Sequence, residues 1–216
     1  MRTRTVSLEG EPFIIPQKGM FQWTKHTQGS RYFGGGWEHL VNDVVCSIPD
    51  GANLLDAGAS FGPYTVLAAK RTAGIIYAFE PCPENFKIMQ GNVANLSNVR
   101  AINSALGASV GSGFLELKSG HHGSHKLVEE KTSASVGVNL TTVDSLGVEI
   151  HTMKIDVEGG GADLLKGAKK TLETTSVIVM ELHNNAELAS WDMLRDIGFT
   201  VTPFHKKGMV ARRENA

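Results

Sequence analysis

Residues 53–62 of the chain read NLLDAGASFG, a short apolar run that leads into an acidic residue and two glycines. The apolar part has the length and composition of a buried strand, and a helix is predicted to follow from Pro63, because proline is favoured at the first position of a helix. Glycine permits a tight turn and a close approach of the backbone to a ligand. A strand, a glycine-rich turn and a helix in this order indicate a ligand-binding unit of an α/β fold.

The rest of the chain continues this alternation of strand and helix. Further strands are predicted over 75–79, 99–102, 153–157 and 177–180, and helices over 37–45, 63–71, 83–95, 162–174 and 186–197. A terminal hairpin is predicted from 199–203 and 209–212, and antiparallel or irregular decoration over 107–146. The pattern favours a doubly wound α/β domain with a mainly parallel, seven-stranded sheet and a C-terminal antiparallel hairpin.

The first 36 residues differ from the remainder, because they hold scattered aromatic residues without helical or strand periodicity. The run Gly34-Gly35-Gly36 predicts a flexible joint at their end. We therefore divide the chain into an irregular N-terminal extension or lid, residues 1–36, and one domain over residues 37–216. A lid would close over the substrate and exclude water.

Composition limits the class of protein. The chain has 216 residues, 41% of them hydrophobic and 20% charged, with a formal net charge of −1, which is typical of a globular domain. This near-neutral charge argues against a nucleic-acid partner. Two separated cysteines and the lack of a long apolar run favour a reducing compartment and no membrane span or signal peptide. We expect a cytoplasmic protein.

Acidic residues at two strand ends indicate the ligand. Glu80 follows the second strand, where a carboxylate can accept two hydrogen bonds from a ribose diol. Asp56 lies at the glycine-rich turn, where its charge disfavours a pyrophosphate and favours an ammonium group. S-adenosylmethionine combines a ribose with an ammonium, a carboxylate and a sulfonium, so the two acids predict this cofactor. The predicted site also includes Gly58, Ala59, Ser60, Gly62 and Pro81. A plain glycine-rich turn with a helix-capping acid is the structural alternative.

A second group of charged residues is predicted to face the transferred group. Lys154, Asp156 and Glu158 alternate along one strand and would share a face, and His183 ends the neighbouring strand. Charges in a central strand are costly unless they are paired or functional, so these four are the candidate catalytic residues. A purely structural lysine–carboxylate pair remains the alternative. Carboxylates with a histidine also suit Mg²⁺, but nothing fixes the number of ligands, and no metal site is predicted.

Residues 58–62, GASFG, also match the nucleophile elbow of serine hydrolases, with Ser60 as the nucleophile. Asp156 with His183 or His205 would complete a triad in the required order. Such an elbow normally follows several strands, whereas this one follows the first core strand. A triad also leaves Glu80 unexplained, so the hydrolase is the weakest alternative.

Taken together, five segments of the chain resemble the FkbM-type methyltransferases. The segments are 56–62, 79–86, 105–107, 141–144 and 154–159, and the last, KIDVEG, is the most specific. The resemblance implies a Rossmann-like class I methyltransferase that uses S-adenosylmethionine. It also implies that Asp56, Gly58 and Glu80 hold the cofactor, that Ser104 and Ala105 lie near the adenine, and that Asp156 faces the site of transfer.

The same resemblance implies a substrate class and raises one question. Enzymes of this family typically methylate hydroxyl groups of sugars, lipids or other small molecules. Where the family has a second glutamate after the Glu-Gly pair, this chain has Gly160-Gly161. One alternative to a small-molecule O-methyltransferase is therefore an inactive cofactor-binding partner subunit. A second is a nucleic-acid methyltransferase, because related tRNA enzymes share the glycine-rich turn and the Glu-Pro strand end.

Overall fold

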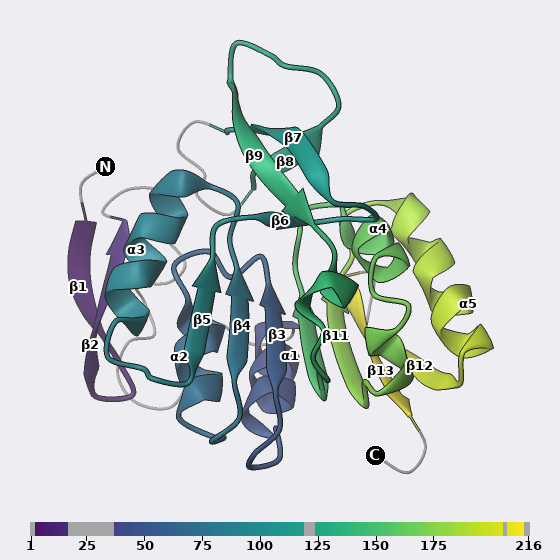
Figure 1. The fold of residues 1–216 in the computed structure, drawn as a ribbon. Helices are drawn as coiled ribbons and strands as arrows, with labels where there is room; N and C mark the ends of the chain where they lie inside the picture. Colours follow the sequence, from purple (N-terminus) through teal and green to yellow (C-terminus); the bar gives the residue numbers. More distant parts are fainter. Residues whose placement is uncertain (1–2, 17–36, 119–123, 205–206, 214–216) are drawn as a thin grey trace.

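A computed structural model describes residues 3–16, 37–118, 124–204 and 207–213 (Figure 1). Its main sheet has seven strands in the order β12-β13-β11-β10-β3-β4-β5. Their bounds are β3 Leu54–Ala57, β4 Ile76–Phe79, β5 Val99–Ile102, β10 Thr152–Ile155, β11 Val177–Glu181, β12 Phe199–Phe204 and β13 Gly208–Arg213. Strand β13 runs antiparallel to both of its neighbours, and the other adjacent pairs are parallel. The predicted doubly wound sheet with a C-terminal hairpin is confirmed.

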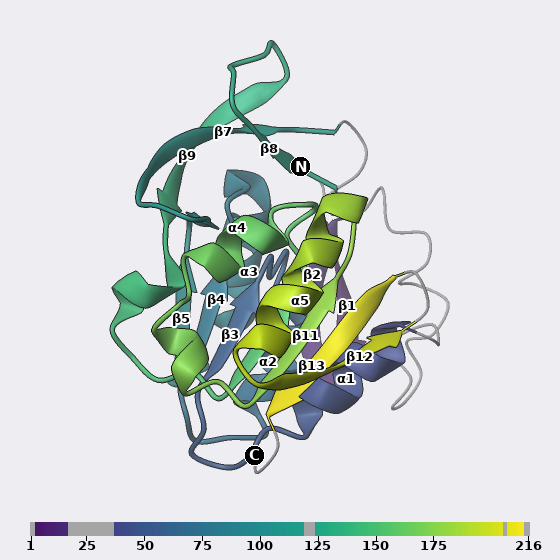
Figure 2. The same cartoon turned by 90° about the vertical axis from the view of Figure 1, so that its right-hand side faces the viewer.

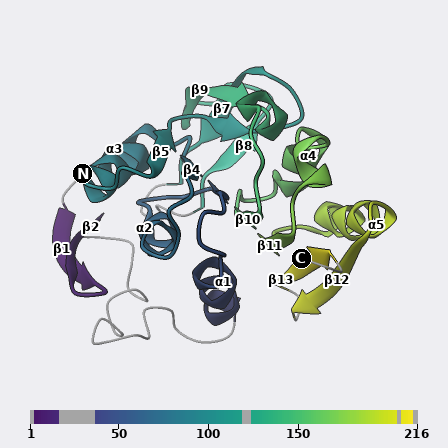
Figure 3. The same ribbon diagram turned by 60° about the horizontal axis from the view of Figure 1, so that its bottom comes forward.

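Helices cover both faces of this sheet (Figures 2 and 3). Helices α1 (Trp37–Cys46), α2 (Pro63–Ala69) and α3 (Pro83–Val93) pack on one face, and α4 (Gly161–Lys166) and α5 (Ala189–Asp196) pack on the other. Because side chains alternate along a strand, Leu54 joins the first core and Leu55 the second. Apolar residues buried on both sides explain why the central strands read as continuous apolar runs.

The predicted helix over 162–174 is shorter than expected. It ends at Lys166, and a separate 3₁₀ turn, η2 (Thr171–Glu173), follows. Gly167 follows this helix, and a Cβ there would lie 2.1 Å from the carbonyl oxygen of Gly107, so a larger residue does not fit at this position. The predicted helix over 186–197 is likewise divided, into η3 (Asn185–Leu188) and α5.

A second sheet lies over the carboxyl edge of the main one, in the region predicted as decoration (Figure 1). It contains β6 (Ala105–Leu106), β7 (Gly111–Glu116), β8 (Lys126–Val128) and β9 (Ser135–Thr141), in the order β6-β9-β7-β8. The β7 pairings are antiparallel, whereas β6 pairs with β9 in parallel. The segment is therefore an ordered sheet above the edge where parallel strands bind ligands.

The prediction that residues 1–36 are irregular is wrong for residues 3–16. These form a hairpin of β1 (Thr3–Leu8) and β2 (Glu11–Pro16), which lies beside α3 (Figure 1). Leu8, Phe13 and Ile15 are buried in the first core. Single-sequence periodicity missed this hairpin because its partner helix lies far along the chain. The Gly34-Gly35-Gly36 joint lies outside the described residues, and the division at residue 36 remains a prediction.

Asn92 of α3 ties the hairpin to the body of the domain. Its side-chain oxygen accepts a hydrogen bond from the backbone N–H of Ile14 at 2.7 Å, and its amide donates to the carbonyls of Ile14 at 2.9 Å and Phe61 at 2.8 Å. Phe61 belongs to the glycine-rich turn, so one amide links the hairpin and that turn.

We expect Asn92→Ala to lower the free energy of unfolding by about 1–3 kcal/mol, because three backbone groups lose their partner. Hydrogen exchange of the Ile14 amide should accelerate. Asn95→Ala is a matched control, since Asn95 is exposed and near the same helix end. Unchanged stability and unchanged exchange at Ile14 would show that the hairpin is held by its apolar contacts alone.

Candidate active site

The floor of the site is a buried ion pair between β3 and β10. Asp56 is 0% exposed, and its Oδ1 lies 3.1 Å from Nζ of Lys154, which is itself 4% exposed. The hydroxyl of Thr65 in α2 donates to Asp56 Oδ2 at 2.6 Å. Although burial alone disfavours the ammonium, the charges of Asp56 and Asp156 raise the pKa of Lys154. The partner of Asp56 is thus Lys154, and the predicted contact of Asp56 with a cofactor ammonium remains a prediction.

Lys154 also shapes the glycine-rich turn. Its ammonium donates to the carbonyl oxygen of Gly58 at 2.8 Å and lies 3.4 Å from that of Ala57. Gly58 has φ of +73°, and a Cβ there would stand 1.8 Å from the carbonyl oxygen of Asp156. Only glycine satisfies both conditions. The turn that the sequence assigned to ligand binding therefore also packs directly on the loop after β10.

Glu80 closes the other side of the turn. Its carboxylate accepts hydrogen bonds from the backbone N–H of Ser60 and that of Cys82, each at 2.8 Å, and the residue is 5% exposed. Burial raises the pKa of Glu80 to about 7, against the opposing effect of these two donors. Each carboxylate oxygen has a second lone pair, so the group retains capacity to accept hydrogen bonds from a ribose.

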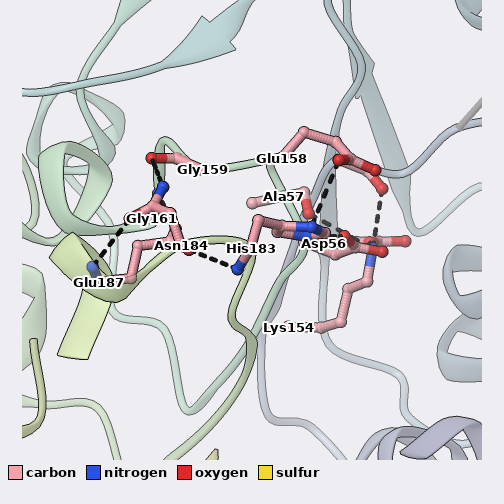
Figure 4. A network of polar contacts seen from close by, with 11 residues as sticks. Asp56, Ala57, Lys154, Glu158, Gly159, Gly161, His183, Asn184 and Glu187 are labelled. Atoms are coloured by element: carbon pink, nitrogen blue, oxygen red, sulfur yellow. Dashed lines mark hydrogen bonds and ion pairs between the residues drawn. The ribbon is translucent and has the colours of Figure 1, made fainter. Parts of the chain in front are cut away.

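Three predicted catalytic residues, Asp156, Glu158 and His183, meet at the carboxyl edge of the sheet. Figure 4 labels two of them, Glu158 and His183. His183 lies between two carboxylates: its Nε2 is 3.1 Å from Asp156 Oδ1, and its Nδ1 is 3.3 Å from Glu158 Oε2. The side chains of Asp156, Glu158 and His183 are 35%, 19% and 16% exposed. Lys154 lies farther away, with Nζ 3.9 Å from Asp156 Oδ2. The site thus presents a partly accessible carboxylate held by two cations.

Burial and charge together set the protonation states of this group. Burial by itself favours a neutral imidazole, but the hydrogen bond to Asp156 and the charges of Asp156 and Glu158 raise the pKa of His183 to about 9. Burial likewise raises the pKa of Asp156, yet Lys154 and His183 outweigh it and the net pKa is lowered. Burial raises the pKa of Glu158. At neutral pH the centre is therefore an imidazolium beside an ionised Asp156.

The prediction that Lys154, Asp156 and Glu158 alternate along one strand is wrong, although Asp156 and Glu158 do meet at His183. Strand β10 ends at Ile155, so Asp156 and Glu158 are not alternate residues of a strand. The N–H of Asp156 still pairs with the carbonyl of Ala57 at 3.1 Å. A turn with φ of +51° at Glu158 and +101° at Gly159 then brings the Glu158 carboxylate back to His183.

Ligand atoms of Asp156, Glu158 and His183 lie within 4.8 Å of one another, a spacing that could hold a metal ion. In the structure both ring nitrogens of His183 instead face carboxylate oxygens.

Two further residues of this site were not selected from sequence. Glu181, at the end of β11, has a pKa raised to about 7, first by burial and then by the charge of Asp156. Tyr64, at the start of α2, has its ring 5.5 Å from Nζ of Lys154. The sequence could have indicated them only by position, since Glu181 follows a predicted strand and Tyr64 lies at the start of a predicted helix.

A cavity of about 270 Å³ opens between the end of β4, the end of β5 and the second sheet. Its lining residues are Pro81, Pro83, Asn103, Ser112, Gly113, Phe114, Gly137, Val138 and Asn139. Asn103 donates to the carbonyl oxygens of Glu80 at 2.8 Å and Pro81 at 3.1 Å, which joins the two strand ends. Ser104 and Ala105, expected near an adenine, are buried behind this wall, and the Ser104 hydroxyl donates to the Asn139 carbonyl.

The geometry does not favour a serine hydrolase. Asp156 and His183 do form the expected acid–imidazole pair, but within the described residues Ser60 makes its hydrogen bond through its backbone N–H to Glu80, and no bond joins its hydroxyl to His183. The imidazole also lacks a free nitrogen, because its other side faces Glu158. His205 lies outside the described residues.

The fold has solved counterparts. SMU.1697c of Streptococcus mutans, a protein assigned as a methyltransferase and solved in complex with SAH, matches 84% of this chain and 100% of its own, with a TM-score of 0.56 and 15% sequence identity. Together with the strand order of the main sheet, this match shows a Rossmann-like α/β fold.

Comparison of sequences then gives the family. The chain belongs to the FkbM methyltransferase family, whose domain model matches residues 56–201. Methyltransferase 1 of Beauveria bassiana is 30% identical over 57% of this chain and 61% of its own length. Hexuronic acid methyltransferase AglP of Haloferax volcanii is 26% identical over 60% of this chain and 55% of its own length. The matched region thus spans about three fifths of these curated relatives. No described helix has the length and apolarity needed to cross a membrane.

Proposed function

We propose that this methyltransferase transfers its methyl group to a hydroxyl oxygen of a small molecule, a sugar or a lipid, with a sugar as the first candidate. The observation that carries the proposal is the partly accessible Asp156 carboxylate, held ionised by His183 and Lys154 at the edge where ligands bind. The relative named as a hexuronic acid methyltransferase supports a sugar acceptor.

The cofactor, when bound, supplies an electrophilic methyl group on its sulfonium. Asp156 accepts a hydrogen bond from the acceptor hydroxyl and turns its oxygen towards that methyl group. Asp156 would take the hydroxyl proton as the acceptor oxygen receives the methyl group, with the demethylated cofactor as the leaving group. Orientation and general-base assistance are the two contributions that such a carboxylate can make.

The neighbours of Asp156 give it this role. His183 donates to Oδ1 and so fixes the carboxylate, leaving Oδ2 for the acceptor. Glu158 holds the opposite nitrogen of the imidazole and keeps the ring in this orientation. Lys154 pairs with Asp56 and donates to the Gly58 carbonyl. It thereby fixes the position of the glycine-rich turn relative to β10, whose following residue is Asp156.

The cofactor residues fit S-adenosylmethionine. Glu80 offers carboxylate lone pairs for the ribose diol, and the cavity between Pro81 and Asn103 has room for an adenine ring beside it. The acidic groups Asp156, Glu158 and Glu181 favour a cation, which suits a sulfonium. In this proposal the second sheet, through Phe114 and Asn139, completes the wall of the adenine site.

Cofactor affinity should depend on the ionisation of Glu80. Because ribose hydroxyls donate to the ionised form, and burial raises the pKa to about 7, binding should strengthen as pH rises through 7. Titration calorimetry should give a dissociation constant about tenfold larger at pH 6 than at pH 8. In the cofactor-free protein, the raised pKa of Glu80 has the opposite effect on stability. The folded state holds the proton of Glu80 more tightly than the unfolded state, so the free energy of unfolding falls as pH rises towards 7.

Glu80→Gln is the control for this pH effect. It retains the shape of the side chain, so any pH dependence that comes from the cofactor itself or from Glu181 persists in the variant. We expect weaker binding that has lost the dependence attributed to Glu80. An identical pH profile in both proteins would remove Glu80 from the ribose site.

The acceptor class is tested by methyl transfer from isotopically labelled cofactor. A panel of hexoses, hexuronic acids and their glycosides, lipids with free hydroxyl groups, and transfer and ribosomal RNA would separate the alternatives. We expect label in an ether on a sugar. Label in RNA would support the nucleic-acid enzyme. Tight cofactor binding with no transfer to any class would support an inactive partner subunit.

A further inference from the structure

Glu187 is a buried carboxylate outside the predicted site. It lies in η3, is 1% exposed, and within the described residues no lysine, arginine or histidine side chain forms an ion pair with it. A carboxylate in such surroundings is costly unless its oxygens are hydrogen-bonded. Its oxygens do have partners: one is the N–H of His183, and the other is the N–H of Gly161, the first residue of α4, which follows the loop that carries Asp156 and Glu158.

Each carboxylate oxygen of Glu187 accepts one hydrogen bond from the backbone (Figure 4). Oε2 accepts a hydrogen bond from the backbone N–H of His183 at 2.7 Å, and Oε1 accepts one from the N–H of Gly161 at 3.0 Å. Gly161 follows the turn that carries Asp156 and Glu158, and His183 follows β11. Glu187 therefore clamps together the two main chains whose side chains meet at the imidazole.

Gly161 makes room for this clamp. A Cβ on Gly161 would stand 2.9 Å from Glu187 Oε1 and 2.2 Å from Cε of Met180. The carboxylate of Glu187 occupies the space that a side chain at position 161 would need. The position of the Glu187 carboxylate thus depends on glycine at 161, and we expect a larger residue there to displace it.

We infer that Glu187 is a positioning residue for methyl transfer, one that holds the His183 main chain so that the imidazole stays between Asp156 and Glu158. This rests on the proposed function for its effect on turnover, but not for its effect on His183. Glu187 is 1% exposed, so this role requires no contact with the acceptor or the cofactor. It acts only through the two backbone N–H groups, and its loss should leave the glycine-rich turn intact.

The first test reads His183 directly, without an acceptor. In the wild-type protein the ring N–H protons of His183, bonded to two carboxylates, should exchange slowly and give separate proton NMR signals. In Glu187→Gln, which keeps the volume of the side chain but turns an amide group towards one backbone N–H, these signals should broaden or disappear. Glu173→Gln, at an exposed position, should leave them unchanged. Unchanged signals in both variants would overturn the inference, even if methyl transfer were never found.

The second test measures coupling to Gly161. In Glu187→Gln we expect kcat to fall about 10- to 100-fold, as for misplaced catalytic groups, with cofactor affinity within a factor of two of wild type. Gly161→Ala should have a similar effect, because its methyl group displaces the carboxylate. The double variant should be no worse than the more impaired single variant. Two effects that multiply would show that the residues act independently and would contradict the clamp.

Discussion

Asp156→Asn is expected to lose turnover by about 10²–10⁴-fold, the usual contribution of a general base, while it continues to fold and to bind cofactor. The amide keeps the shape of the side chain but can neither take the hydroxyl proton nor balance the imidazolium of His183. A large loss of folding stability is not expected, because the side chain is 35% exposed and Lys154 has Asp56 as its nearer partner. Single-turnover rates with saturating labelled cofactor, alongside melting temperatures, measure both effects.

Asp163→Asn is the matched control for this substitution, since its carboxylate is 61% exposed and, among the described residues, its one ion pair is with Lys166. It should leave turnover unchanged. If Asp156→Asn melted far below wild type and its folded fraction turned over normally, Asp156 would be structural. The proposal for the acceptor hydroxyl would then fail.

A chelator separates a base from a metal ligand at the same position. Because the imidazolium of His183 already stands between Asp156 and Glu158, we expect EDTA to leave wild-type turnover unchanged and added Mg²⁺ to leave it unaltered. Activity lost in EDTA and restored by Mg²⁺ would instead assign Asp156, Glu158 and His183 as ligands, in line with their spacing.

The sequence predicted for a sound physical reason that Glu80, Asp156 and His183 lie along one edge of the sheet. Each follows a strand of the parallel sheet, and the carboxyl ends of parallel strands share one edge. Strand identity was readable because strands buried on both faces are continuous apolar runs. No knowledge of side-chain direction was needed to bring these residues together.

Side-chain partners were less predictable, because they depend on contacts between distant segments. The pairing of Asp56 with Lys154 requires β3 and β10 to be neighbours in register, with Lys154 directly opposite Asp56. Glu187 falls within the helix predicted over 186–197, whereas the chain there forms a 3₁₀ turn in which its side chain is buried. The hairpin at residues 3–16 depends on α3 in the same way.

The largest effect on stability is expected from Lys154→Met. The substitution leaves the fully buried Asp56 without a counter-ion and the Gly58 carbonyl without a donor. Breaking one partner of a buried pair typically costs about 3–5 kcal/mol, because the remaining charge is buried and uncompensated. Denaturant unfolding should show a loss of this size, and cofactor binding should weaken with it, since the glycine-rich turn loses its support.

A double-mutant cycle decides whether the ion pair is the cause. Asp56→Asn together with Lys154→Met removes both charges and keeps a side chain of the same shape beside Thr65, so stability should recover by a large part of the loss seen in Lys154→Met alone. Lys166→Met is the matched control, because its pair with Asp163 has a shorter separation, 2.7 Å, but both side chains are about 60% exposed. That exposed pair should contribute only about 0–1 kcal/mol. Burial, rather than distance, would then account for the difference. A Lys154→Met protein as stable as Lys166→Met would instead mean that Thr65 and the backbone are enough to hold Asp56 in the core.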